Sequence, residues 1–302
     1  MRTIILTSVF AALCLSAAPA AAQTQLGRPT PQQMEGLDVL KGAGSDIIEP
    51  FKIIDNLYYV GARNIASYLI VTPQGMILLD TGLQRMHEGI LANIRKLGFN
   101  PRDIKIMINS HAHFDHIEGH AAMAKATGAT VIAMRRDVPA LRAGKDMSGA
   151  GVDGWPPIKI DRIIDDGAKI TLGGETLTAI NLPGHTQGAT SWRMEVQDGG
   201  RPYTVFVVGG GNPNAWDELV NNPRHPLIVQ DTVATLQRMS AMPKPDIVLS
   251  GHPQAAFEGK IDRIKSGARP HPLTVSQAEW DEMQARNRSG FMDMLNRQIS
   301  RK

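Results

Sequence analysis

Cysteine is almost absent from this chain, because the only one among its 302 residues is Cys14. It lies in residues 1–22, which have the parts of an export signal: a basic start at Arg2, an apolar run and small residues ending at Ala22. We therefore expect cleavage near Ala22 and a mature chain, residues 23–302, that has no cysteine. This excludes disulfides and thiolate metal sites, so the mature protein must rely on its core or on other metal ligands.

A retained membrane anchor is the alternative for this N-terminal stretch. The apolar run from Ile4 to Leu15 is shorter than the roughly 20 residues that a membrane-spanning helix needs, and Pro19 follows it. We therefore predict that the mature form has no membrane span and that the protein is exported to the periplasm.

The sequence also lacks a marked excess of one charge. Its 32 basic and 29 acidic residues are interspersed, so a net charge of +3 and a pI near 9.0 arise without a basic stripe. Nucleic-acid binding therefore has little support. There is no internal repeat or low-complexity tract, and no segment indicates an obligate protein partner. The length and the 42% hydrophobic content are enough for one large core.

Strand-like and helix-like segments alternate along the chain in two similar halves. Runs rich in β-branched and apolar residues, bounded by Gly, Asn or Pro, predict strands; they occupy residues 51–60, 67–82, 105–109, 168–182, 189–197, 203–210 and 246–250. Helical spacing of apolar residues predicts helices; it is found in residues 83–98, 228–242 and 276–300. In the last segment, Ser276 and Glu279 form a capping-box pattern, and Gly290 is a possible bend. The alternation predicts an α/β fold with layered sheets and helices outside.

The nine histidines are unevenly distributed along this pattern. His111, His113 and His116 lie in the stretch NSHAHFDHIEG, directly after a predicted strand. His185 and His252 likewise follow predicted strands, in loops that contain Gly or Pro. Because strand ends converge on one edge of an α/β sheet, we expect residues more than 140 positions apart to share one pocket.

The residue types in these loops predict a metal centre. Imidazoles and a carboxylate without a thiolate suit zinc or a similar divalent ion. Alternate residues of an extended segment face the same side, so His111 and His113 could hold one ion while Asp115 and His116 hold a second. Six candidate ligands for two ions leave coordination positions open, as catalytic sites do. Metal binding lowers the pKa of water from 15.7 to about 7, so the pattern predicts hydrolysis by a metal-bound hydroxide.

The remaining histidines have simpler interpretations. His87, His225 and His271 are isolated in the sequence and are interpreted as surface or hydrogen-bonded residues. His120 follows His116 by four residues, so it could support a ligand from behind. A non-enzymatic zinc-binding protein is also an alternative, but closed-site cysteines or a long His-rich tract would be expected there, and neither is present.

The stretches HAHFDH, PGHT and GHP together resemble the metallo-β-lactamase superfamily, and most closely its third subclass of β-lactamases, which uses only histidines and one aspartate as ligands. SYLIVTPQGMILLDTGL, DGWPPIKIDRIIDDGAKI and TQGATSW extend the similarity over most of residues 51–254. The resemblance implies a four-layered αβ/βα sandwich over residues 23–302 with two zinc ions between its sheets.

The resemblance also implies roles for individual residues. His111, His113 and His185 would hold the first zinc, and Asp115, His116 and His252 the second. Asp115 would in addition orient the attacking hydroxide. The implied reaction is hydrolysis of the amide bond of a small-molecule β-lactam, which confers antibiotic resistance. No covalent enzyme intermediate is required, and the serines lack the motifs of nucleophilic serine enzymes.

The sequence departs from the family pattern after residues 203–208. Relatives that hydrolyse lactones, thioesters or phosphodiesters usually carry a bridging aspartate there, and other β-lactamase subclasses carry a cysteine. This chain has three glycines followed by Asn212, which favours the third subclass, although the serine often found nearby in that subclass is also missing. A hydrolase of lactones, thioesters or phosphodiesters remains the alternative, and Asp217 is a candidate substitute for the bridging residue.

Substrate contacts are less well defined by the sequence. Trp155, in the long Gly-rich loop 144–157, could form an apolar wall or pack that loop against the fold. Gly210, the last residue of the predicted strand 203–210, and Asn212 are candidate contacts, although Asn212 is equally typical of a turn before Pro213.

Overall fold

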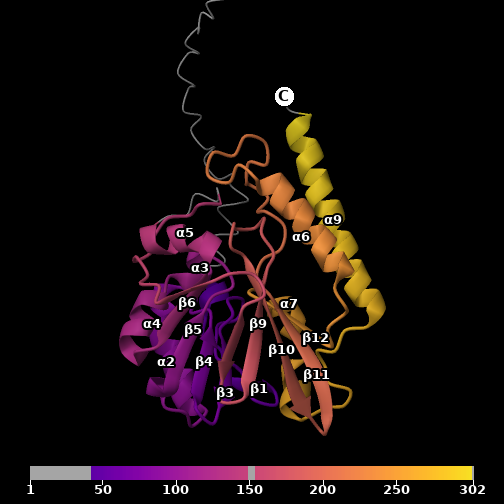
Figure 1. The fold of residues 1–302 in the computed structure, drawn as a ribbon. Helices are drawn as coiled ribbons and strands as arrows, with labels where there is room; N and C mark the ends of the chain where they lie inside the picture. Colours follow the sequence, from indigo (N-terminus) through magenta and orange to yellow (C-terminus); the bar gives the residue numbers. More distant parts are fainter. Residues whose placement is uncertain (1–41, 149–153, 301–302) are drawn as a thin grey trace, which may run out of the picture.

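Two β-sheets face each other across a buried apolar layer in the computed structural model, which describes residues 42–148 and 154–300 (Figure 1). The first sheet has seven strands in sequence order: β1 (Phe51–Ile54), β2 (Leu57–Tyr59), β3 (Tyr68–Thr72), β4 (Gly75–Leu79), β5 (Ile104–Ile108), β6 (Thr130–Met134) and β7 (Arg162–Ile164). Strands β1 to β4 pair antiparallel, and β4 to β7 pair parallel.

The second sheet has five strands in the order β12-β11-β10-β9-β8: β8 (Lys169–Leu172), β9 (Glu175–Asn181), β10 (Thr190–Asp198), β11 (Arg201–Val208) and β12 (Ile247–Ser250). Only β11 and β12 pair parallel. Helices cover the outer faces of both sheets, which makes four layers (Figure 1). They are α2 (His87–Lys96), α3 (Phe114–Ile117), α4 (His120–Thr127) and α5 (Val138–Ala143) in the first half, and α6 (Ile228–Ala241) and α9 (Gln277–Ile299) in the second. The short helices α7 (Gln254–Phe257) and α8 (Ile261–Lys265) instead pack beside β1 and contribute Phe257 and Ile264 to the layer between the sheets.

Strands such as β4, β6 and β11 are apolar over most of both faces because both faces are covered, whereas β10 carries exposed Glu195 and Gln197 between buried residues. In β4, Ile77 and Leu79 point into the layer between the sheets, whereas Leu78 packs beneath the first-half helices. In β11, Val205 faces the other sheet, while Phe206 packs beside Trp280 of α9. This double burial explains why the strands appear in the sequence as nearly continuous apolar runs.

The predicted α/β class and layered sandwich are confirmed, and most predicted segments match. Residues 51–60 and residues 168–182 each form two strands rather than one. The chain turns at Asp55, which has a left-handed φ of 48°, and at Gly173 and Gly174, whose φ angles are 56° and 96°. The sequence interpretation missed β6 and the short helices α5, α7 and α8. Helix α9 begins after the predicted cap, Ser276, and continues through Gly290.

The predicted signal segment, residues 1–22, lies outside the described residues. Within the described ranges, no helix is both long and apolar enough to cross a membrane.

Strand ends bring the sequence motifs together. The HAHFDH segment follows β5, the loop with His185 follows β9, and the loop with His252 follows β12. A hydrogen bond of 2.7 Å from the Thr190 amide to the Ser110 carbonyl oxygen joins the two sheets beside these loops. The site is therefore built from both halves of the sandwich.

Gly209, at the end of β11, is packed too closely to carry a side chain. A Cβ atom there would lie 1.8 Å from the Thr190 carbonyl oxygen, whereas a Cβ atom at Gly211 would meet nothing within 4 Å. We predict that Gly209→Ala destabilises the protein by about 1–3 kcal/mol, because the backbone must shift to relieve the overlap. Urea unfolding of metal-free protein checks this, with Gly211→Ala as the matched control. Equal midpoints for the two variants would contradict it.

Candidate metal centre

The segment after β5 changes direction within a few residues. His113 has extended backbone angles (φ −111°, ψ 149°) directly before α3, so Asp115 and His116 lie on the first helical turn. The extended part presents His111 and His113, and the helical part presents the other two side chains. The change from strand-like to helical geometry therefore divides one short motif between two positions in space.

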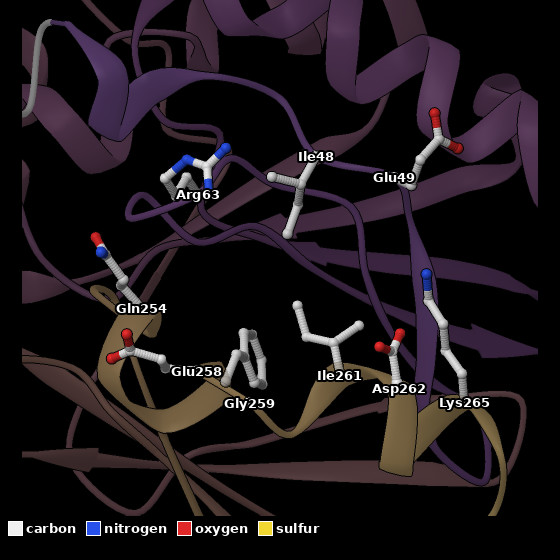
Figure 2. A pocket seen from close by; sticks show the side chains of 10 residues that line it. Ile48, Glu49, Arg63, Gln254, Glu258, Gly259, Ile261, Asp262 and Lys265 are labelled. Atoms are coloured by element: carbon white, nitrogen blue, oxygen red, sulfur yellow. The ribbon is translucent and has the colours of Figure 1, made fainter.

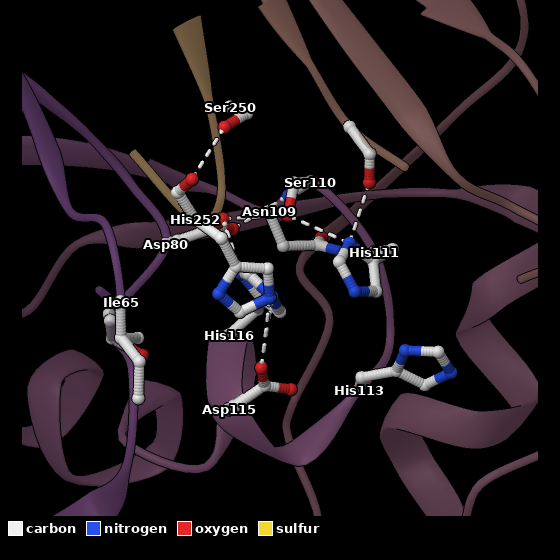
Figure 3. Close-up of polar contacts among 12 residues, drawn as sticks. Ile65, Asp80, Asn109, Ser110, His111, His113, Asp115, His116, Ser250 and His252 are labelled. Carbon is white, nitrogen blue, oxygen red and sulfur yellow. Dashed lines mark hydrogen bonds and ion pairs between the residues drawn. The ribbon is translucent and has the colours of Figure 1, made fainter. Parts of the chain in front are cut away.

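Six side chains form two groups of three that could each hold a metal ion. In each group the possible ligand atoms lie within 4.8 Å of one another. His111, His113 and His185 form the first group, and Asp115, His116 and His252 form the second. The ring centroids of His111 and His116 are 4.1 Å apart, so the two groups are adjacent. Figure 3 shows His116 and His252 above Asp115, with His111 and His113 beside them.

Hydrogen bonds fix which ring nitrogens point into the first group. His111 Nδ1 lies 2.6 Å from the Gly209 carbonyl oxygen, and His185 Nδ1 lies 2.9 Å from that of Asn212. A carbonyl can only accept, so both Nδ1 atoms are donors, and both Nε2 atoms are left with a lone pair when the rings are neutral. Nε2 of His111 is buried without a hydrogen-bond partner. Nε2 of His185 faces Nδ1 of His113 at 3.1 Å.

The second group is arranged in the same way. His116 Nδ1 lies 3.1 Å from Asp80 Oδ2, and His252 Nδ1 lies 2.8 Å from the Asn64 carbonyl oxygen. Their Nε2 atoms are 3.3 Å apart, and each lies 3.3 Å from Asp115 Oδ2. Lone pairs that converge in this way repel one another unless a cation or a proton lies among them. The donor atoms of the second group are therefore suited to binding a metal ion.

The two groups differ in their electrostatics. Burial, followed by the nearby ring of His116, lowers the pKa of His111 well below its usual value. Burial and the ring of His113 lower the pKa of His185 to about 3. Burial also lowers the pKa of His113, although Asp146 opposes this effect. The first group therefore consists of neutral imidazoles at neutral pH, the form that binds metals.

In the second group a carboxylate reverses this effect. Burial favours the neutral ring of His116, but Asp115 and Asp80 raise the pKa of His116 to about 10. Burial opposes ionisation of Asp115, but contact with His116 outweighs it and lowers the pKa of Asp115. This group therefore attracts positive charge.

Asp80 supports the ligand segment from behind. It has a left-handed φ of 60° in the turn after β4 and is 1% exposed. Its carboxylate accepts hydrogen bonds from the amide (2.7 Å) and hydroxyl (2.6 Å) of Ser110, as well as from His116 (Figure 3). Asp80 thereby fixes both the start of the ligand segment and the orientation of one ring.

Asp137 joins two ligand loops in the same manner. Its Oδ2 accepts from the Ala112 amide and the Thr186 hydroxyl, both at 2.9 Å, and its Oδ1 accepts from the Gly188 amide at 2.7 Å. Burial raises the pKa of Asp137 to about 6, while these three donors favour the ionised form. It is therefore ionised at pH 7 and holds the His111–His113 segment against the loop of His185.

The predicted substrate contacts have other neighbours in the structure. Trp155 is 3% exposed and packs in the core beneath the first-half helices, which fits the packing alternative. Gly210 lies against His185, since a Cβ atom there would be 2.9 Å from the His185 Cβ. Asn212 donates from Nδ2 to the Asn287 carbonyl oxygen of α9 at 2.6 Å. Asp217 is fully buried and accepts from the Asn214 amide, outside both groups of candidate ligands.

The other histidines are placed away from the two groups. His225 bonds Asp231, His271 bonds the Ile53 carbonyl oxygen, and His87 bonds the Gln84 carbonyl oxygen. His120 is buried, with Nδ1 2.7 Å from the Thr81 hydroxyl; Thr81 in turn donates its amide to the His116 carbonyl oxygen. The support from His120 is therefore indirect.

A cavity of about 400 Å³ lies where α7 and α8 meet the segment before β1 (Figure 2). Ile48 and Ile261 line it together with charged side chains of both signs, among them Arg63 and Glu258. None of the six candidate ligands borders this cavity, so we do not assign the substrate to it.

Comparison with known proteins places this geometry in a family. Residues 60–198 match the model of the metallo-β-lactamase superfamily. A solved subclass B3 metallo-β-lactamase, BJP-1 of Bradyrhizobium japonicum, is 38% identical; the match covers 87% of this chain and 99% of that one, with a TM-score of 0.81. The chain belongs to the metallo-β-lactamase superfamily. The superfamily resemblance predicted from the sequence is thus confirmed.

Other proteins that are similar to this chain differ from one another in activity. The metallo-β-lactamase FEZ-1 of Legionella gormanii is 33% identical, with 84% of this chain and 98% of that one covered and a TM-score of 0.79. The N-acyl homoserine lactonase AttM of Azorhizobium caulinodans is 27% identical, with 58% of this chain and 75% of that one covered. A hydroxyacylglutathione hydrolase of Rhodospirillum rubrum is 24% identical over 76% of each chain. This chain is therefore a hydrolase of the metallo-β-lactamase superfamily, and its groups of histidine and aspartate side chains suggest that it binds zinc.

Sequence reasoning missed the groups that orient the ligands. Asp80 lies in the stretch SYLIVTPQGMILLDTGL, one of those that carry the family resemblance, but Asp137 and Asn64 act through contacts between distant segments. An acid between two apolar segments was the only sequence signal for Asp137, and such acids are common at helix starts.

We predict that Asp137→Ala destabilises the metal-free protein by about 3 kcal/mol or more. The substitution leaves three buried donors without their acceptor, and each lost partner costs about 1–3 kcal/mol. Urea unfolding of metal-free protein measures the change. Asp165→Ala, the same substitution at an exposed partner of Arg135, should leave the midpoint nearly unchanged. If the two variants unfold together, Asp137 does not join the loops as described.

Proposed function

We propose that the protein is a zinc-dependent β-lactamase that hydrolyses the amide bond of the β-lactam ring. The observation that carries this proposal is the ligand set: five histidines and one aspartate, with no carboxylate or thiolate where β11 leads into the loop of Gly209–Asn212. Solved structures of β-lactamases match nearly their whole length to this chain at 30–38% identity, which supports the same proposal.

The packing at Gly209 and Gly210 supports the absence of a bridging side chain. A Cβ atom at Gly209 would overlap the Thr190 carbonyl oxygen, and one at Gly210 would lie 2.9 Å from the His185 Cβ. A longer side chain at either position would displace the backbone or His185. The relatives expected to carry a bridging aspartate there need a different local backbone, so this loop favours the β-lactamase over the other hydrolases.

We propose two zinc ions per chain. His111, His113 and His185 would hold the first, and Asp115, His116 and His252 the second. Zinc supplies a Lewis acid and lowers the pKa of water to about 7, so that hydroxide is available at neutral pH. The chain holds its rings neutral in the first group and contributes one negative charge in the second.

Asp115 is the proposed catalytic residue. Its Oδ2 and the Nε2 atoms of His116 and His252 all lie 3.3 Å from one another, so these three atoms would together hold the second ion. Its other oxygen can accept a hydrogen bond from the attacking water and keep a lone pair of that water aimed at the carbonyl carbon. Gly210, which adjoins His185, is the proposed backbone contact for substrate. We do not assign this role to the side chains of Trp155 and Asn212, because the first is buried in the core and the second bonds α9.

The second candidate function is hydrolysis of a lactone or thioester on the same metal centre. It is favoured by the curated relatives, which are N-acyl homoserine lactonases and hydroxyacylglutathione hydrolases at 23–27% identity. The lower identity of these relatives and the glycines after β11 argue for the β-lactam substrate.

We predict that purified mature protein opens a chromogenic cephalosporin, loses this activity with a chelator and regains it with zinc. Asp115→Asn should lower kcat by about 10²–10⁴-fold, because the water is no longer oriented. The control Asp165→Asn should match the wild type. Metal-loaded protein that ignores penicillins, cephalosporins and carbapenems but cleaves an acyl homoserine lactone or a glutathione thioester would replace the first function with the second.

We further propose that the protein acts in the periplasm after removal of residues 1–22, on a small molecule and without an obligate protein partner. Expression of the full chain in a Gram-negative host should give periplasmic protein whose intact mass corresponds to a start at Gln23. Retention of Met1 in the membrane fraction would contradict this and indicate an anchor.

A further inference from the structure

His113 is oriented differently from the other four histidines of the metal centre. Those four each donate from Nδ1 to a carbonyl or carboxylate oxygen. His113 instead turns Nδ1 toward His185, and its Nε2 lies 2.9 Å from the Ser148 hydroxyl oxygen. A different group must therefore fix the proton of this ring.

The polarity of the contact follows from Asp146. Its Oδ1 accepts from both the amide and the hydroxyl of Ser148, each at 2.7 Å, and lies 3.7 Å from His113 Nε2. Because the single hydroxyl proton of Ser148 points to Asp146, the Ser148 oxygen must accept from His113 Nε2–H. The proton of His113 is thereby held on Nε2, and the lone pair of Nδ1 faces His185.

These two residues are themselves held in place. Asp146 and Ser148 are each 1% exposed. The Ser148 carbonyl oxygen accepts from Asn222 Nδ2, and the Asp146 carbonyl oxygen accepts from Arg224 Nη1, both at 2.9 Å. The turn at 146–148 is thus attached to a segment of the second half of the chain, and its position does not depend on exposed side chains.

We infer that Asp146 and Ser148 are positioning residues that fix the ring tautomer and orientation of His113 for the first metal ion. This inference rests on the proposed function, since it takes the first histidine group as a zinc site. Loss of a hydrogen-bond partner behind a ligating histidine typically weakens metal binding about 10–100-fold.

The experiment uses Ser148→Ala in the mature full-length protein. Stepwise zinc dissociation constants come from competition with a chromophoric chelator, and ring tautomers come from ¹⁵N-histidine spectra of the zinc-loaded protein. We expect one zinc site to weaken about 10–100-fold while the other changes little. In the wild type we expect one ligating ring, His113, to be protonated on Nε2, and this proton should exchange faster with solvent in the variant.

Ser240→Ala is the control, because it removes a hydroxyl that bonds helix carbonyls in α6, away from the metal centre. Both zinc constants should be unchanged in it. If Ser148→Ala leaves both constants within about twofold of the wild type, or if His113 is protonated on Nδ1, the role of Ser148 is overturned. Wild-type protein that binds no zinc would instead overturn the proposed function. Urea midpoints of the metal-free variants separate either result from loss of folding.

Discussion

The metal centre depends on electron pairs that are held close together against their mutual repulsion. Nitrogen atoms of neighbouring rings face each other at 3.1 and 3.3 Å. Each ring is kept there by a hydrogen bond on its opposite side, mostly to main-chain oxygens of distant segments. The repulsion between these lone pairs destabilises the metal-free fold, and a bound cation or proton removes it.

The sequence predicted the parts of this centre that are local. His111, His113, Asp115 and His116 lie in one short motif, and strand ends were sufficient to bring His185 and His252 to it. The layered fold was also predictable, because strands buried on both faces appear as apolar runs. Strands such as β6 were missed because TVIAM is short and has no helical or alternating pattern of its own.

The surrounding network could not be predicted, for a physical reason. Asn64 and Gly209 act through carbonyl oxygens, which every residue type carries, so no side chain marks the position. Asp137, Asp146 and Ser148 are common loop residues whose roles depend on how loops from both halves meet. Such contacts depend on the folded path of the chain, and the residue types at these positions do not indicate them.

Both candidate ligand groups draw on the two halves of the sandwich. The segment after β5 is combined with His185 from the second half in one group and with His252, also from the second half, in the other. Ions bound there would tie the two sheets together at their upper edge, which is the work that disulfides do in many exported proteins. Residues 42–148 and 154–300 contain no cysteine, so bound metal would there affect stability as well as chemistry. A ligand present at 100 times its dissociation constant stabilises the folded state by about 2.7 kcal/mol.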